Sequence, residues 1–164
     1  MNIFILSLIP KECAQMHCDK HCVKMILEYA QLLSCAHHIL DEEKAIQGIY
    51  KKTHVNHPCA IWTRKTDTNY EWLYSLFVSL CDEYTHRYNK IHLTDTKMRT
   101  LLKNKPKNIP SGSLTPFALA MPNMYKRDCA IKSYMLYYIH SKRKNKRDKD
   151  MLIYTNREIP YFLQ

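Results

Sequence analysis

Four polar side chains near the start of the chain fall on one side of a segment that is otherwise apolar. The segment spans residues 17 to 33 and reads HCDKHCVKMILEYAQLL. At about 100° per residue, a helix here would align four polar residues on one stripe: His21, Lys24, Glu28 and Gln31. A helix that is apolar nearly all round is buried, so this stripe must face either a polar pocket or buried partners.

The groups on this stripe suit acid–base and covalent catalysis. Glu28 can act as a general base, Lys24 as an amine made reactive by desolvation, and His21 as a proton shuttle. In the structural alternative, Lys24 and Glu28 form an ion pair four residues apart, and His21 bonds to a carbonyl. The number of titratable groups on one face of an apolar helix favours the catalytic pocket.

The same segment holds two pairs of side chains with the spacing of metal ligands. One pair is His17 and His21, and the other is Cys18 and Cys22. No second pair of this kind follows along the chain, and a Cys in a helix is commonly a small buried apolar residue. A zinc site is therefore the minor alternative, and we expect neither a metal ion nor another cofactor.

A further histidine, His57, lies next to Pro58, whose ring restricts the backbone. The preceding stretch, residues 41 to 57, is polar and contains Gly48, which predicts a loop. The His57 side chain could face the first helix or lie exposed in a turn, and the sequence leaves both alternatives open.

The elements that must position these residues are helices. Apolar residues that include Val23 and Leu27 recur at helical spacing from Pro10 to about Leu40, with a break expected near Asp19. Further helices are predicted over three ranges: Thr66 to Tyr88, Thr94 to Leu102, and Asp128 into the basic segment that follows.

The remaining segments complete the expected fold. Apolar residues 3 to 9 predict a short buried N-terminal strand, and four prolines between Lys105 and Pro122 predict a long loop that borders a site. The chain length allows one core, so we expect a mainly α, compact helical bundle with a single domain spanning residues 1–164.

The charge of the chain favours polyanionic partners. The formal net charge is +10, from 25 Lys and Arg against 15 Asp and Glu. Six basic residues form a block within residues 141–150: Lys142, Arg143, Lys144, Lys146, Arg147 and Lys149. The block is either a solvated, frayed segment or a nucleic-acid contact. Arg64 and Arg87 are further candidates for binding phosphate, although Arg87 could instead form an ordinary surface pair with Glu83.

Aromatic side chains could complement this charge by stacking bases, and the chain has 12 Tyr and 2 Trp. On the last predicted helix, Tyr134 and Tyr138 share a face expected in the core. Tyr137 lies on another face, from which it could stack a base.

Composition excludes several classes of protein. With Gly48 and Gly112 as its only glycines, the chain cannot build a Gly-rich phosphate loop or a dinucleotide-binding fingerprint. Seven scattered cysteines predict reduced thiols and an intracellular location. The N-terminal apolar run has no basic leader and is too short for a membrane span or a secretory signal, so we expect neither membrane association nor secretion.

Several short motifs resemble a family of small uncharacterised proteins from bacteriophages and large DNA viruses. They are the stretch from Cys18 to Glu28, Asn56-His-Pro-Cys59, Asn69-Tyr-Glu-Trp72, Thr115-Pro-Phe-Ala118 with Met121-Pro122, and Tyr137-Tyr138. This resemblance covers nearly the whole chain and implies a viral setting, in the cytoplasm or nucleus of a host or in the virion.

The stretch from Ile5 to His17 is similar to the phage pyrimidine-dimer DNA glycosylases of the endonuclease V type, and Tyr137-Tyr138 resembles an aromatic segment near that family's end. The resemblance implies a small, basic, all-helical enzyme whose extended N-terminal segment leads into the first helix. It also implies an amine nucleophile near a Glu.

The chain departs from that family at the catalytic groups. The family attacks with the amino group of a small residue exposed by removal of the initiator Met, whereas Asn2 stands there in this chain. The position of the family's Glu falls between His21 and Lys24. If the chemistry persists, the amine would be Lys20 or Lys24 and the acid Glu28 or Asp19, and His21 and His57 would orient the sugar-phosphate.

The leading hypothesis is a DNA-acting enzyme, namely a base-excision N-glycosylase or abasic lyase. Phosphates would be held by Arg64, Arg87 and the basic block. Two alternatives remain open. One is a non-catalytic module that binds DNA, RNA or a host factor, and the other is an enzyme of nucleotide metabolism.

Overall fold

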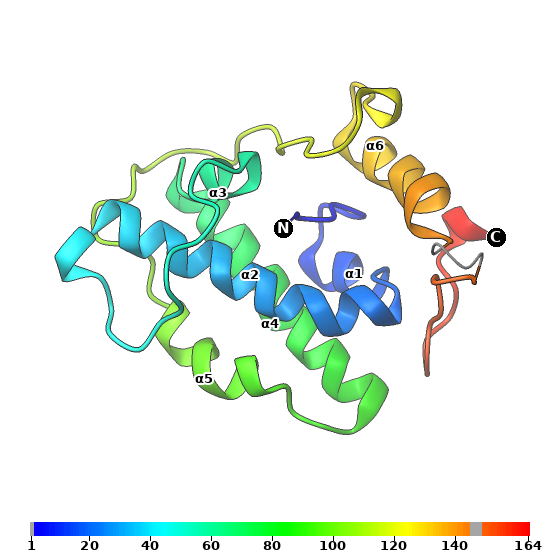
Figure 1. Ribbon diagram of the computed structural model, residues 1–164, viewed down its shortest axis with the longest axis horizontal. Helices are drawn as coiled ribbons and strands as arrows, with labels where there is room; N and C mark the ends of the chain where they lie inside the picture. The colour runs from blue at the N-terminus through cyan, green and yellow to red at the C-terminus, as the bar shows by residue number, and fades with distance from the viewer. Residues whose placement is uncertain (1, 145–148) are drawn as a thin grey trace.

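The computed structural model describes residues 2–144 and 149–164 and consists mainly of helices (Figure 1). The α-helices are α1 (Pro10–Gln15), α2 (Asp19–Leu40), α3 (Pro58–Thr63), α4 (Asp67–Tyr88), α5 (Leu93–Leu102) and α6 (Ala130–Tyr137). The π-helical turn η3 (Tyr138–Lys142) continues α6, and short 3-10 turns form η1 (Glu42–Lys44), η2 (Asn123–Tyr125) and η4 (Tyr161–Leu163). The prediction of a mainly α fold is confirmed.

The core is built on the two long helices, α2 and α4. Helix α4 packs against both α1 and α2, and α2 also packs against α3 and α5. The break predicted near Asp19 separates α1 from α2, and the Thr66 hydroxyl caps α4 by accepting the Asn69 N–H. The short helix α3 lies just after the predicted loop of residues 41 to 57 and was not itself predicted.

The N-terminal segment, residues 2–9, is extended and is drawn between α2 and α6 in Figure 1. Its residues 3–6 are buried, whereas Leu8 and Ile9 are exposed, contrary to the predicted burial of the whole run. It is not a β-strand, because strand pairing among the described residues is limited to one isolated bridge between Lys144 and Asp150. Side chains satisfy its backbone instead: the Phe4 N–H donates to the Tyr29 hydroxyl, and the Leu6 N–H donates to the Cys13 thiol.

The Pro-rich loop crosses the surface in extended form, as predicted, and is held by side chains of α4. The Asp67 carboxylate accepts the Gly112 N–H at 2.9 Å. The Asn69 amide oxygen accepts the Thr115 N–H at 2.9 Å, and its NH₂ group donates to the Thr115 hydroxyl at 2.8 Å. These contacts position the loop so that its end lies beside the N-terminal segment. There the Asn2 amide donates to the Ala120 carbonyl at 3.0 Å.

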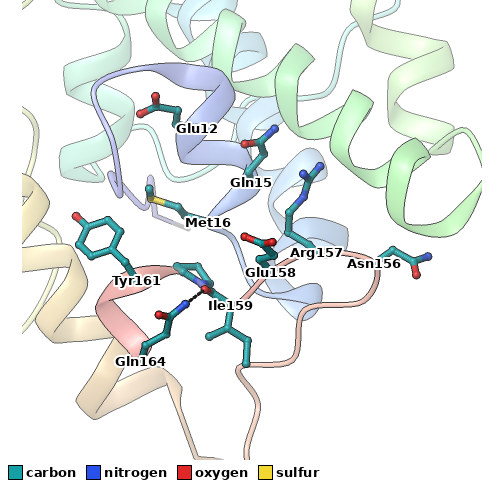
Figure 2. A pocket seen from close by; sticks show the side chains of 10 residues that line it. Glu12, Gln15, Met16, Asn156, Arg157, Glu158, Ile159, Tyr161 and Gln164 are labelled. Atoms are coloured by element: carbon teal, nitrogen blue, oxygen red, sulfur yellow. Dashed lines mark hydrogen bonds between the residues drawn. The ribbon is translucent and has the colours of Figure 1, made fainter.

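The C-terminal tail, residues 151–164, returns to α1 and borders a cavity of about 690 Å³ on that side of the molecule (Figure 2). Glu12, Gln15 and Met16 line it from α1 and the residue after it, and Arg157, Glu158 and Ile159 line it from the tail. The Tyr154 hydroxyl donates to the Met16 carbonyl at 3.0 Å, which attaches the tail directly to the end of α1.

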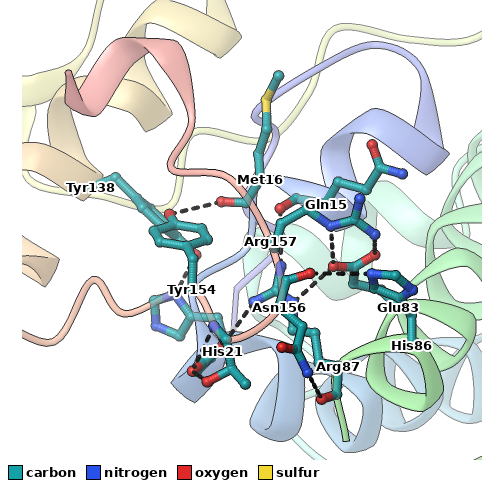
Figure 3. Close-up of polar contacts among 12 residues, drawn as sticks. Gln15, Met16, His21, Glu83, His86, Arg87, Tyr138, Tyr154, Asn156 and Arg157 are labelled. Carbon is teal, nitrogen blue, oxygen red and sulfur yellow. Dashed lines mark hydrogen bonds and ion pairs between the residues drawn. The ribbon is translucent and has the colours of Figure 1, made fainter. Parts of the chain in front are cut away.

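A buried ion-pair network centred on Arg87 joins these parts of the chain (Figure 3). The Arg87 guanidinium donates to Glu83 at 2.7 Å, to Asp19 at 3.0 Å and to the Gln15 carbonyl at 3.0 Å. Arg157 of the tail adds two bonds to Glu83, at 2.9 and 2.7 Å. Burial alone would raise the pKa of Glu83, but hydrogen bonds from the two guanidinium groups hold it below its ordinary value.

This network corrects two sequence-based interpretations. The pair of Glu83 and Arg87 is not an ordinary surface pair, because their side chains are 4% and 0% exposed. Arg87 is also unavailable to bind phosphate, since its donors are used inside the protein.

Removing Arg87 should therefore be strongly destabilising. The Arg87→Ala variant would remove the cation that pairs with the carboxylates of Glu83 and Asp19. We therefore expect the free energy of unfolding to fall by about 3–5 kcal/mol. Urea unfolding measures this loss. Arg99→Ala is the matched control, because Arg99 also pairs with a carboxylate four residues away, Asp95, but is more exposed. In Arg99→Ala the free energy of unfolding should fall by only about 0.2–1 kcal/mol. Equal losses in the two variants would contradict the role of burial in making the Arg87 pairs important.

Candidate active site

A pocket of about 290 Å³ opens where the N-terminal segment, α2 and α6 meet. Its lining residues are Asn2 and Phe4 of the N-terminal segment, Lys20, His21, Lys24, Met25 and Glu28 of α2, Ala120 of the loop, and Tyr137 and Lys142 of α6 and η3. Three of the four stripe residues, His21, Lys24 and Glu28, thus line a pocket, whereas Gln31 does not. Lys20 and Lys142 lie there with them.

Lys24 and Glu28 form an ion pair at this pocket, with 3.0 Å between Lys24 Nζ and Glu28 Oε1. The Lys24 side chain is 63% exposed, whereas that of Glu28 is 12% exposed. The expected desolvation of Lys24 is therefore wrong, because its amine lies in solvent at the mouth. Glu28 is the one carboxylate among the described residues that line the pocket.

His21 forms part of the pocket wall and is held on two sides. Its Nδ1 is hydrogen-bonded to the Tyr138 hydroxyl, and its ring stacks on Phe4 with 4.3 Å between ring centroids. Burial, together with a smaller effect of nearby positive charge, lowers the pKa of His21 to about 3. At neutral pH this imidazole is uncharged, so it offers hydrogen bonding without adding to the positive charge of the lysines.

The opposite wall combines an aromatic ring with another amine. Lys142 Nζ lies 4.5 Å from the centroid of the Tyr137 ring, and this ring is inclined by only 24° to that of Phe4. Tyr134 and Tyr138 are fully buried, which confirms their predicted place in the core, and Tyr137 lines the pocket. Lys20, Lys24 and Lys142 together make the pocket attractive to phosphate.

Asp19 does not line this pocket. Its carboxylate accepts bonds from Arg87 and from the backbone and hydroxyl of Thr155. Burial would raise the pKa of Asp19, but these hydrogen bonds lower it. The carboxylate is therefore occupied in attaching the tail to α2, which leaves Glu28 as the acid at the pocket.

His57 and Arg64 also lie outside the pocket lining, at the two ends of α3. The His57 ring caps α3 by accepting the Cys59 N–H at 3.1 Å. Arg64 donates to the Val55 carbonyl at 2.7 Å and so supports the preceding loop. Neither contact brings these side chains to the stripe on α2.

The alternative zinc ligands are engaged in the core. Both ring nitrogens of His17 are hydrogen-bonded, to the Cys13 carbonyl and to the Tyr29 hydroxyl, each at 2.7 Å. Cys18 and Cys22 are buried thiols, and burial raises the pKa of Cys22 to about 12. Over the described ranges, no group of three or more His, Cys, Asp or Glu side chains could hold a metal ion.

Among the described residues of the basic block, Lys142 is the one that lines the pocket. Arg143 pairs with Asp150 at 3.4 Å on the surface, and Lys144 forms a backbone bridge to the same residue. Lys146 and Arg147 lie outside the described residues.

Asn2 and Phe4 line the pocket, although the sequence pattern does not indicate a site role for either residue. The Asn2 side chain oxygen accepts a bond from the Tyr134 hydroxyl at 3.0 Å, and its amide holds Ala120. A polar residue directly before an apolar run is the signal that could have identified Asn2.

Fold and site together define a mainly helical protein with a lysine-rich pocket. Among the described residues, one carboxylate lines this pocket, that of the largely buried Glu28. The description of the family whose model matches residues 1–96 is pyrimidine dimer DNA glycosylase. The chain therefore belongs to the pyrimidine dimer DNA glycosylase family, which implies DNA as its partner. No curated protein and no solved structure is matched by the chain. A search for membrane-spanning helices over the described residues found none of sufficient length and apolarity.

The buried histidines predict a specific dependence of stability on pH. The pKa values of His17 and His21 fall from an ordinary 6.5 to about 4 and about 3, mainly because burial disfavours the charged ring. Below about pH 6.5 the unfolded chain binds protons that the folded chain does not, so stability falls by up to about 1.4 kcal/mol per pH unit for each ring.

Urea unfolding between about pH 7 and about pH 5 tests this dependence. His17→Gln should have a shallower slope than the wild type, because one of the buried rings with a lowered pKa is gone. His86→Gln alters an exposed histidine and should leave the slope unchanged. An unchanged slope for His17→Gln would contradict burial as the cause.

Proposed function

We propose that the chain is a base-excision N-glycosylase with abasic lyase activity, acting on damaged pyrimidines in DNA. The observation that carries the proposal is the pocket itself, where a carboxylate and amines lie together on the part of α2 matched by the family. The resemblance to phage and large DNA virus proteins supports repair of a viral genome as its setting.

In this mechanism an amine of the pocket attacks the sugar at C1′. Glu28 accepts a proton from the ammonium of Lys24, its neighbour at 3.0 Å, and the amine forms a bond to C1′. The glycosidic bond breaks, and the base leaves with its electron pair and takes the second proton of the attacking nitrogen. Glu28 returns its proton to the ring oxygen O4′, so that the sugar opens as an imine.

The other groups of the pocket bind and orient the substrate. Lys20 and Lys142 hold phosphates, and neutral His21 donates or accepts a hydrogen bond to the sugar. Tyr137 provides an aromatic face for a displaced base. Lys20 is the second candidate for the attacking amine.

A non-catalytic DNA-binding module is the second candidate function. The observation in its favour is that Lys24 is exposed and paired with Glu28, as in a structural ion pair. Such a module would bind DNA with a steep salt dependence and leave it chemically unchanged.

Borohydride trapping distinguishes the two candidates. Labelled duplexes would contain a pyrimidine dimer, an abasic site or no lesion, and the wild type should form a covalent adduct with the first two alone. Glu28→Gln removes the proton acceptor, so we expect the trapping rate to fall by about 10²-fold or more. Glu158→Gln, which alters an acid of the other cavity, should react at the wild-type rate.

The lysine assignment has its own test in the same assay. One of the two variants, Lys24→Ala or Lys20→Ala, should abolish adduct formation, and it identifies the attacking lysine. Thermal unfolding of that variant should stay cooperative, which shows that the fold survives. Full activity in both variants would exclude a lysine of α2 as the nucleophile. Salt-dependent binding of the wild type with no adduct and no strand cleavage would instead favour the binding module.

A further inference from the structure

Two apolar residues of α2, Val23 and Leu27, are exposed, although their spacing predicts that they are buried. Their exposed fractions are 42% and 39%, although the sequence pattern assigns both to the core face. They lie one helical turn apart, and we call them the apolar ridge. Single exposed apolar residues are ordinary on protein surfaces, so the position of this pair on the helix decides its meaning.

The apolar ridge runs beside the pocket described above. Along the helix, Leu27 is rotated by about 60° from Lys24 in one direction, and Glu28 by about 40° in the other. Lys24 therefore separates the ridge from Glu28, and the exposed Lys20 lies one turn before it on the same side. A ligand that reaches the pocket across this face meets lysines and apolar side chains together.

We propose that the apolar ridge packs against bases of duplex DNA at the lesion while the target nucleotide occupies the pocket. This inference rests on the proposed function. Lys20 and Lys24 are placed to contact phosphates, and apolar side chains between such contacts can fill the gap left when a nucleotide leaves the stack. The ridge thereby favours the opened duplex over the intact one.

Charge favours DNA over a second copy of this chain as the occupant. A symmetric dimer through the ridge would bring the lysines of the two α2 helices towards each other, and like charges at an interface oppose association. A phosphate backbone places opposite charge beside the same lysines.

The test compares one abasic site in two settings, single-stranded DNA and duplex DNA. The variant Val23→Gln/Leu27→Gln places a good helix former at both positions and alters only exposed residues. Single-stranded DNA has no duplex to open, so we expect the trapping rate of the variant on that substrate to stay within about twofold of the wild-type rate. On the duplex we expect a loss of about tenfold or more.

Ile91→Gln/Leu93→Gln is the matched control, since both residues are exposed apolar side chains, Leu93 as the first residue of α5 and Ile91 two positions before it. This control should match the wild type on both substrates. Thermal unfolding of all variants checks the fold, and the milder Leu27→Ala should show a smaller loss confined to the duplex.

The outcomes separate this inference from the proposed function. A wild type that reacts with neither substrate removes the proposed function, and the inference with it. A wild type that reacts with both, with the ridge variant equal to it or equally impaired on both, overturns the inference alone. A change in oligomeric state without a duplex-specific loss also overturns it and identifies a second copy as the occupant.

Discussion

The buried guanidinium of Arg87 is the interaction on which the arrangement of the chain depends. A charge in the core is unfavourable unless it is paired and hydrogen-bonded, and here the partners come from α4 itself, from α2 and from the end of α1. Because Asp19 opens α2, its bond to Arg87 sets the position of that helix's first turn. Arg157 and Thr155 bring the tail to the same two carboxylates.

The pocket follows from this placement of α2. With Asp19 turned towards Arg87, the pocket-lining residues of the next turns lie towards the N-terminal segment and α6. The bond between His21 and Tyr138 joins α2 to the end of α6, and the bond between Asn2 and Tyr134 joins the N-terminal segment to its middle. The part of the chain matched by the family supplies the amines of α2 and the carboxylate, and residues beyond it supply the aromatic wall and Lys142.

Local pattern was sufficient to predict the long helices and the stripe on α2, because both depend on periodicity within one segment. It also separated Tyr137 from the two buried tyrosines of α6. Local pattern could not predict interactions between residues that are far apart in the sequence. Asp19 and Thr155 are 136 positions apart, and His21 and Tyr138 are 117 apart. Asp19 and Arg87 therefore resembled site residues, although both are structural, and Val23 and Leu27 resembled core residues, although both are exposed.

The most direct test of the account is to identify the residue that carries the trapped DNA. The wild-type protein would be reduced with borohydride on an abasic duplex and digested, and the adduct located by mass spectrometry. Attachment to an amine of the pocket lining, with Lys24 or Lys20 expected, would place the chemistry beside Glu28. Attachment to a lysine remote from the pocket, such as Lys65 or Lys103, would contradict the account.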